Sequence, residues 1–286
     1  YAHLLYALDP QRTLVTVHDI APLRFPGYTL GLSQLSWMIA WRALKRACQI
    51  VTVSRFTASE LLMYLQGRIV KMYVVPNGVD EAFHRQPEEV IHQTRSRYQD
   101  LGEHLLLHVG HTHARKNLSV LIRAVKLLRS QGLQVGLIQV GGCPGKELFN
   151  LIVDEQGMSN WVRFVGLIDD AQLVALYSAV DAFVFPSLYE GFGLPVLEAM
   201  ACGAPVIASN VASLPEVVGD AGILVDPTDV TALADAIWRA LMDVELRERL
   251  RQQGLMRARE FSWQRCAQNT LAVYQQIIRD SKRQIV

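Results

Sequence analysis

Residues 182–205 read AFVFPSLYEGFGLPVLEAMACGAP, and this stretch decides how the chain folds. Its first four residues are apolar and predict a buried strand, after which a loop leads into a helical pattern. Gly191 and Gly193 let the backbone turn tightly and approach a ligand without a side chain in the way. Pro195 suits the first turn of the helix, and Gly203 suits its C-terminal cap. We therefore expect a strand–loop–helix unit whose helix amino terminus can bind phosphate.

The same alternation of strand and helix runs along most of the chain. Short apolar, β-branched runs predict strands at 14–17, 50–53, 72–75, 105–109, 136–140, 162–165, 182–185, 205–208 and 223–225. Most of these runs lack the in/out alternation of a half-exposed strand, as expected of parallel strands that are buried on both faces. The predicted fold class is therefore α/β, with open, doubly wound parallel sheets.

The composition is that of a globular protein long enough for two domains. Of 286 residues, 50% are hydrophobic and 19% are charged, and the net charge of +1 leaves no electrostatic footprint for nucleic acid. The cysteines at 48, 143, 202 and 266 form no C-x-x-C pair, which suits reduced thiols in a cytoplasmic protein. No apolar run reaches the roughly 18 residues that cross a bilayer.

The strand–helix alternation breaks once, in a polar stretch between about 80 and 104. We predict an N-terminal Rossmann-like domain at 1–84, an interdomain connection at 85–103, a C-terminal Rossmann-like domain at 104–262, and a helix at 263–286 that returns toward the N-terminal domain. Only three strands precede the break, which is few for a Rossmann-like domain. We therefore expect the N-terminal domain to be incomplete and the chain, which opens at Tyr1, to lack its natural N-terminus.

Two glutamates stand beside the expected phosphate site. Glu190 lies at the entrance of the loop, and Glu198 lies on the helix about one turn in. Carboxylates at such a place would repel a diphosphate unless they bind something else, and a carboxylate can accept two hydrogen bonds from a vicinal diol of a sugar. The alternative is that Glu198 only complements the helix dipole and that Glu190 is a solvated loop charge.

The run E-G-F-G-L-P-V-L-E-A-M-A-C-G at 190–203 resembles the signature of family 4 glycosyltransferases, with its paired glutamates. Further blocks of that family follow the right order along nearly the whole chain: VHD at 17–19, IVTVS at 50–54, VVPNGVD at 74–80, VGHTHARKN at 109–117, VRFVG at 162–166 and LPEVVGDAGILVDP at 214–227. The resemblance implies the GT-B fold, in which two Rossmann-like domains face a cleft, with the N-terminal domain incomplete in this chain.

The resemblance also implies roles for the matching residues. The candidate catalytic residues are Glu190 and His18, near the transferred sugar, and Arg115 and Lys116, which would stabilise the charge that builds on the leaving diphosphate. Glu198 would accept hydrogen bonds from the donor ribose. The other donor-binding candidates are Gly191, Phe192, Gly193 and Leu194 in the loop, Val165 and Gly166 at the end of another strand, and Ser54 and Asn77. Without the family blocks, Arg115 and Lys116 would read as a solvated basic turn and His18 as a surface histidine.

A metal site is the alternative interpretation of several histidines and aspartates, at 108, 111, 113, 169 and 170. No carboxylate is correctly spaced beside the histidines, and no strand-borne D-x-D is present, so we predict neither metal nor cofactor. The segment 30–44, with Trp37 and Trp41, could be an amphipathic helix that touches the inner membrane surface, although such a helix more often covers a sheet.

The implied function is a retaining, metal-independent hexosyltransferase that moves a sugar from a nucleoside-diphosphate sugar to a glycan or lipid-linked acceptor in polysaccharide or glycoconjugate synthesis. Similarity to bacterial polysaccharide mannosyltransferases favours GDP-mannose as donor, with UDP-sugars next. Two alternatives stay open: a fragment that binds nucleotide sugar without turnover, and a GT-B sugar-nucleotide epimerase. A glycogen-type phosphorylase would need a lysine that carries pyridoxal phosphate, and nothing in the sequence suggests one.

Overall fold

The computed structural model describes residues 13–25, 42, 44, 49–66, 71–142, 153 and 157–283. The chain separates into two compact units. Unit 1 consists of Tyr1–Gly78, Glu190–Phe192 and Trp263–Val286, and unit 2 consists of Val79–Tyr189 and Gly193–Ser262. None of the described helices is both long enough and apolar enough to cross a membrane.

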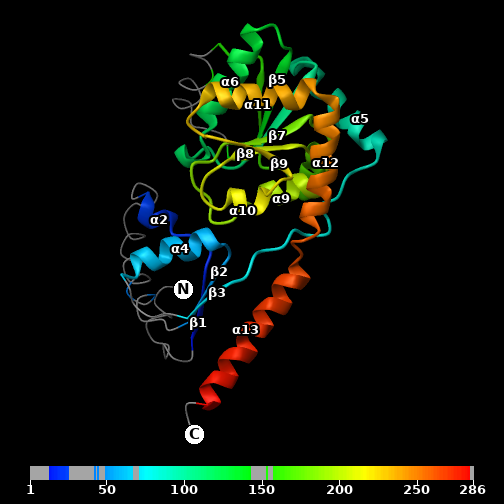
Figure 1. The fold of residues 1–286 in the computed structure, drawn as a ribbon. Coiled ribbons are helices and arrows are strands. Elements are labelled where there is room, and N and C mark those ends of the chain that lie inside the picture. The colour runs from blue at the N-terminus through cyan, green and yellow to red at the C-terminus, as the bar shows by residue number, and fades with distance from the viewer. Residues whose placement is uncertain are drawn as a thin grey trace. The chain divides into compact units, whose positions relative to one another are not determined.

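Unit 2 is built on a six-stranded parallel sheet in the order β6-β5-β4-β7-β8-β9 (Figure 1). The strands are β4 (His104–Val109), β5 (Val135–Val140), β6 (Val162–Gly166), β7 (Ala182–Phe185), β8 (Val206–Ser209) and β9 (Gly222–Val225). The strand order reverses between β4 and β7. In an open α/β sheet, such a reversal marks the place beyond the carboxyl ends of the strands where ligands bind.

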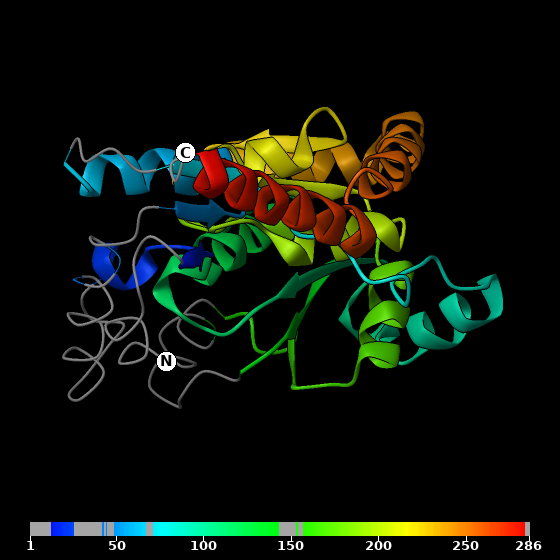
Figure 2. The ribbon, with the colours of Figure 1, turned by 90° about the horizontal axis from the view of Figure 1, so that it is seen from below.

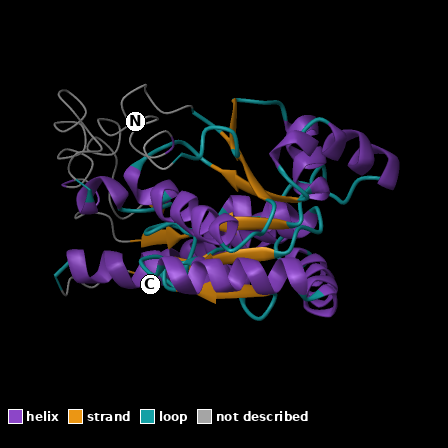
Figure 3. Cartoon of the chain, turned by 90° about the horizontal axis from the view of Figure 1, so that it is seen from above, coloured by secondary structure: helices purple, strands orange, loops and turns teal. Residues whose placement is uncertain are grey.

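The helices of unit 2 precede, connect or follow these strands along the chain (Figure 3). They are α5 (Glu88–Ser96), η3 (Gln99–Leu101), η4 (Ala114–Lys116), α6 (Leu118–Ser130), α8 (Asp170–Ala179), α9 (Leu194–Ala201), α10 (Leu214–Val218), α11 (Val230–Met242) and α12 (Val244–Ala258). On one face of the sheet, α6 and α11 lie side by side and share a core cluster with β5, β7 and β8 (Figure 1). The apolar face of α6 is fully buried there, because its leucines and valines recur at helical spacing.

Unit 1 contains a three-stranded parallel sheet, β1 (Leu14–Val17), β2 (Gln49–Thr52) and β3 (Lys71–Val74), with the short helix α2 (Ala21–Arg24) and the connecting helix α4 (Arg55–Tyr64). The long helix α13 (Trp263–Arg283) also belongs to this unit (Figure 2). Val273 of α13 packs with Val51 and Val75, and Lys71 forms a 2.8 Å ion pair with Asp280.

All nine predicted strands are present, and every observed end lies within one residue of the expected one. The stretch 85–103, expected as a connection, instead forms α5 and η3 within unit 2. It reads as polar because α5 buries only Ile91 and Thr94 and exposes most of its other residues. The segment 30–44, interpreted as an amphipathic helix, lies outside the described residues except for Arg42 and Leu44.

Candidate active site

The predicted cations of unit 2 lie in a turn that is hydrogen-bonded to the loop after β7. This turn, η4, follows β4, so both segments extend from carboxyl ends of neighbouring strands. The Leu188 N–H donates to the Arg115 carbonyl at 2.7 Å, and Arg115 Nη1 donates to the Tyr189 carbonyl at 3.2 Å. The structure therefore brings Arg115 directly against the residues that precede Glu190.

Lys116 is almost completely buried, with 6% of its surface exposed. Its Nζ lies 4.6 Å from the centroid of the Phe185 ring, which attracts a cation only modestly. Its stem runs along Gly110, where an added Cβ would lie 3.1 Å from Lys116 Cε. Lys116 therefore places a positive charge beside the carboxyl ends of β4 and β7, where an anionic ligand of such a sheet would bind.

Asn117 follows Lys116 and precedes α6. It is the N-cap of this helix by position, but its backbone is left-handed (φ 57°, ψ 35°) and its side chain does not cap the helix. Instead, Asn117 Nδ2 donates to the Pro186 carbonyl at 3.1 Å and to the Pro227 carbonyl at 2.6 Å. In the left-handed conformation the side chain reaches the neighbouring loops.

The helix after the glycine loop has an open amino terminus. Gly193, the residue before α9, has a φ of 113°, and a Cβ there would lie 2.8 Å from Leu214 Cδ2, so only glycine fits. Glycine offers no side chain to cap the helix, Pro195 has no N–H, and the Val196 N–H donates to the Gly193 carbonyl at 3.0 Å. This helix end therefore offers an anion the Leu194 N–H and the positive end of the helix dipole. The predicted C-terminal end is confirmed: Gly203 is left-handed, and the Ala204 N–H donates to the Ala199 carbonyl at 2.9 Å.

Glu198, in the second turn of α9, has a partner that the sequence did not indicate. The hydroxyl of Tyr177 donates to Glu198 Oε2 at 3.0 Å. Burial raises the pKa of Glu198, and the charge of Asp170 adds to this shift, whereas the hydrogen bond from Tyr177 opposes it. Burial, and then the neighbouring Glu198, raise the pKa of Tyr177 well above its usual value, so the tyrosine stays a neutral donor.

In unit 1, the structure brings together three of the predicted residues: His18, Ser54 and Gly191. Ser54 Oγ donates to the Gly191 carbonyl at 2.7 Å and accepts from the Thr57 N–H at 3.0 Å as the N-cap of α4. A Cβ on Gly191 would overlap the His18 carbonyl, so only glycine lets the backbone at 191 approach His18 this closely. Ser54 thus has a structural role: it caps α4, and it is hydrogen-bonded to the backbone of Gly191.

The remaining predicted residues are distributed over both units. Glu190 and Phe192 are buried, with 8% and 6% of their surfaces exposed, and Asn77 is buried after β3. Gly166 ends β6 in a left-handed conformation, and its carbonyl accepts from the Gly141 N–H at 2.9 Å. Val165 beside it is half-buried.

The histidines that suggested the metal alternative lie in different environments. His108 is fully buried in β4, and burial together with the positive charge of Lys116 lowers its pKa to about 3. His111 and His113 lie beside each other in the loop, with ring centroids 5.9 Å apart. Across the described residues, no three His, Cys, Asp or Glu side chains are grouped as a metal site would require.

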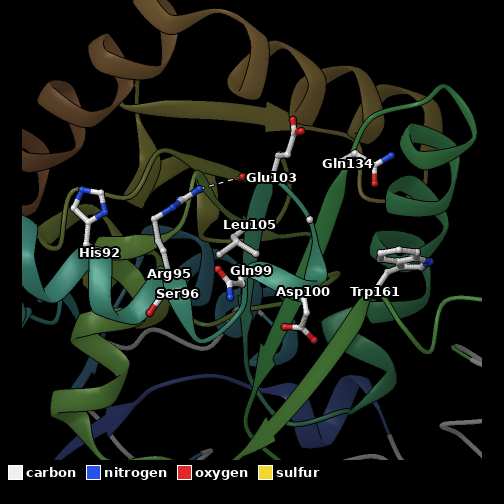
Figure 4. A pocket seen from close by; sticks show the side chains of 10 residues that line it. His92, Arg95, Ser96, Gln99, Asp100, Glu103, Leu105, Gln134 and Trp161 are labelled. Atoms are coloured by element: carbon white, nitrogen blue, oxygen red, sulfur yellow. Dashed lines mark hydrogen bonds between the residues drawn. The ribbon is translucent and has the colours of Figure 1, made fainter.

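A cavity of about 680 Å³ lies at the opposite edge of the unit 2 sheet (Figure 4). It is lined by residues that precede β4, β5 and β6, among them Glu103, Gln134 and Trp161, and by the end of α5. Arg95 already has partners there: it donates to the Glu103 carbonyl at 3.1 Å (Figure 4), and it forms an ion pair with Asp181. Since ligands of doubly wound sheets bind at the carboxyl ends of the strands, we do not assign the donor to this cavity.

Comparison with known proteins agrees with this architecture. The family model described as glycosyl transferases group 1 matches residues 90–257, and the model described as glycosyltransferase family 4 matches residues 1–83. The O-antigen chain mannosyltransferase B of Escherichia coli is 36% identical over 271 residues, which are 92% of this chain and 70% of that protein. The serotype-specific mannosyltransferase WbdA of Escherichia coli is 30% identical over 281 residues, but this chain spans only 34% of its length.

Among solved structures, the sucrose-phosphate synthase of Thermosynechococcus elongatus superposes with a TM-score of 0.77 at 28% identity, over 93% of this chain and 68% of that one. The resemblance predicted from the sequence blocks is thereby confirmed, as is the class of two Rossmann-like parallel-sheet domains. The chain belongs to the group 1 glycosyltransferases of family 4 and has the GT-B fold.

Proposed function

We propose that this chain transfers a hexose, with mannose favoured, from a nucleoside-diphosphate sugar to a glycan or lipid-linked acceptor during polysaccharide synthesis at the cytoplasmic side of the cell. Its similarity to an O-antigen chain mannosyltransferase and to a serotype-specific mannosyltransferase supports GDP-mannose as the donor. UDP-sugars are the next choice.

The observation that carries the proposal is the group of positive features at one edge of the unit 2 sheet. The Arg115–Lys116 turn is braced against the loop after β7, and the same loop continues toward the uncapped amino terminus of α9. A guanidinium, a buried ammonium and a helix dipole suit a diphosphate without requiring a metal ion.

We assign the other donor contacts to the neighbouring elements. Glu198 accepts hydrogen bonds from the ribose, in an orientation that Tyr177 fixes. Backbone groups near Val165 and Gly166 meet the base, and those of Phe192, Gly193 and Leu194 meet the phosphates and the sugar. Within unit 1, Glu190 and His18 contact the transferred sugar, and Asn77 lies at the end of β3 as a weaker candidate.

The proposed transfer retains the configuration at the anomeric carbon. The bond from that carbon to the diphosphate oxygen breaks, the acceptor hydroxyl oxygen forms the new bond on the same face, and its proton passes to the departing diphosphate. Arg115 and Lys116 stabilise the negative charge that builds on the leaving group, which is often the largest contribution of an enzyme to such a step.

Calorimetric titration with GDP and with UDP, in the absence of divalent metal, tests the binding part of this proposal. We expect one nucleotide to bind and Glu198→Ala and Arg115→Ala each to weaken it about tenfold or more. Arg239→Ala on α11 and Glu248→Ala on α12 remove exposed charges of the same kind and are the matched controls.

Release of the nucleoside diphosphate from GDP-mannose, with and without a mannan oligosaccharide as acceptor, tests the transfer. Acceptor-dependent release with an α-linked product from the α-linked donor supports a retaining transferase. Binding without release would favour the non-catalytic nucleotide-sugar-binding alternative. Failure of both GDP and UDP to bind the folded wild type would remove the proposed donor site.

A further inference from the structure

Asn117 occupies a backbone conformation that few residues other than glycine adopt. Its φ of 57° and ψ of 35° lie in the left-handed region, which costs an L-residue free energy, although asparagine tolerates it best among side chains with a Cβ. The residue therefore gives up local stability. A contact made by its side chain must offset this cost if asparagine rather than glycine occupies the position.

The side-chain amide of Asn117 supplies such a contact. The residue is 8% exposed, and Nδ2 donates one hydrogen bond to the Pro186 carbonyl at 3.1 Å and one to the Pro227 carbonyl at 2.6 Å. Pro186 directly follows β7, and Pro227 follows β9. A single buried amide thus joins three loops at the carboxyl edge of the unit 2 sheet: its own after β4, and those after β7 and β9.

The backbone of Asn117 fixes the cations in turn. Its N–H donates to the Ala114 carbonyl at 3.0 Å and closes the turn that contains Arg115 and Lys116, while its carbonyl accepts from the Val120 N–H at 3.2 Å at the start of α6. The turn cannot shift along the loop after β7 without breaking the bond to Pro186. Its separation from that loop is therefore set by Asn117 as well as by the bonds of Arg115.

We propose that Asn117 is a positioning residue for the donor diphosphate: it holds the Arg115–Lys116 turn at a fixed place relative to the loops after β7 and β9. This inference rests on the proposed donor site. It does not require that Asn117 touch the donor. Because an electrostatic site works only when its charges are held in place before the ligand arrives, a loosened turn should bind the terminal phosphate poorly while ribose and base contacts persist.

The test compares a nucleoside diphosphate with its monophosphate in calorimetric titrations. Asn117→Gly keeps the left-handed backbone but removes both hydrogen bonds, and Asn117→Asp keeps the volume but turns a double donor into an acceptor facing two carbonyl oxygens. For the base that the wild type prefers, we expect the affinity for GDP or UDP to fall about tenfold in both variants, and the affinity for GMP or UMP to change less than about twofold.

Asp243→Ala, which removes the N-cap of α12, is the control for general destabilisation at a helix start. It should leave the ratio of diphosphate to monophosphate affinity unchanged. An unchanged ratio in both Asn117 variants would overturn the inference while leaving the donor site intact, and so would a failure of both variants to fold, since the role would then be structural. A wild type that binds neither nucleotide would overturn the donor site and this inference together.

Discussion

At the scale of single residues, the hydrogen bond from Tyr177 to Glu198 has a consequence for ligand binding that depends on pH. The Tyr177 hydroxyl favours the charged form of Glu198, whereas burial favours its neutral form. In Tyr177→Phe the pKa of Glu198 rises further. The carboxylate that is proposed to accept hydrogen bonds from the ribose therefore becomes protonated at a higher pH. We expect nucleotide affinity to fall about threefold to tenfold near neutral pH and to decline earlier than in the wild type as the pH is lowered.

Titrations with the nucleotide at several values between about pH 5 and 8 measure this shift. Tyr274→Phe on α13, where half of the tyrosine surface is exposed, is the matched control. Superimposable pH profiles for the wild type and Tyr177→Phe would contradict the assigned orientation of Glu198.

His108 makes the stability of unit 2 depend on pH in a predictable direction. Within the described part of the chain, neither ring nitrogen has a partner in hydrogen-bond geometry, although the Lys116 backbone lies close enough to favour the protonated ring slightly. The pKa of about 3 in the folded state lies below the value of about 6.5 in the unfolded chain. As the pH falls below about 6.5, the unfolded state takes up a proton that the folded state does not, so stability decreases.

The expected loss is about 1.4 kcal/mol per pH unit, or roughly 2 kcal/mol at pH 5 relative to pH 7. His108→Leu removes this contribution and also replaces an unsatisfied polar ring by an apolar side chain, which is neutral or stabilising at pH 7. Urea unfolding at both pH values measures the difference, with the exposed His92→Leu as the control. Parallel pH dependence in the wild type and His108→Leu would contradict this expectation, because it would mean that the pKa of His108 is the same in the folded and unfolded states.

At the scale of elements, the sequence predicted the strands of unit 2 well because parallel strands buried on both faces are continuous apolar runs. β5, for example, is buried at all of its positions. The loop and helix at 190–203 were predicted equally well, since Gly193 and Gly203 each adopt a left-handed backbone conformation that L side chains rarely adopt. α5 was missed because a short helix with two buried residues carries little periodic signal.

The side-chain contacts of the site could not be predicted in the same way. Tyr177 reaches Glu198 across 21 positions, and Asn117 reaches Pro227 across 110. Neither spacing follows from the period of a helix or a strand. The first contact arises where α8 packs against α9, and the second where βα loops converge at one edge of the sheet. The sequence block A-R-K-N contains Asn117, but its local spacing does not indicate contacts with residues 69 and 110 positions away.

At the scale of the whole molecule, α13 shows that segments distant in the sequence complete one unit. Val273 is 7% exposed and packs with Val51 and Val75, so Val273→Glu places a charge in that cluster and should destabilise unit 1 by several kcal/mol. Unit 2 has a core cluster of its own, and its amides should keep their protection. Hydrogen exchange with mass spectrometry, read separately for peptides of 49–66 and 104–140, distinguishes the two units.

Leu271→Glu is the matched control on the same helix, because Leu271 is 56% exposed and its replacement leaves the cluster intact. We expect faster exchange in 49–66 for Val273→Glu alone, with 104–140 unchanged in both variants. Equal acceleration in both segments would mean that the units unfold as a single cooperative body. In that event the loss of nucleotide binding in any variant of unit 1 could not be attributed to a residue near the sugar, since it would follow from unfolding of unit 2 itself.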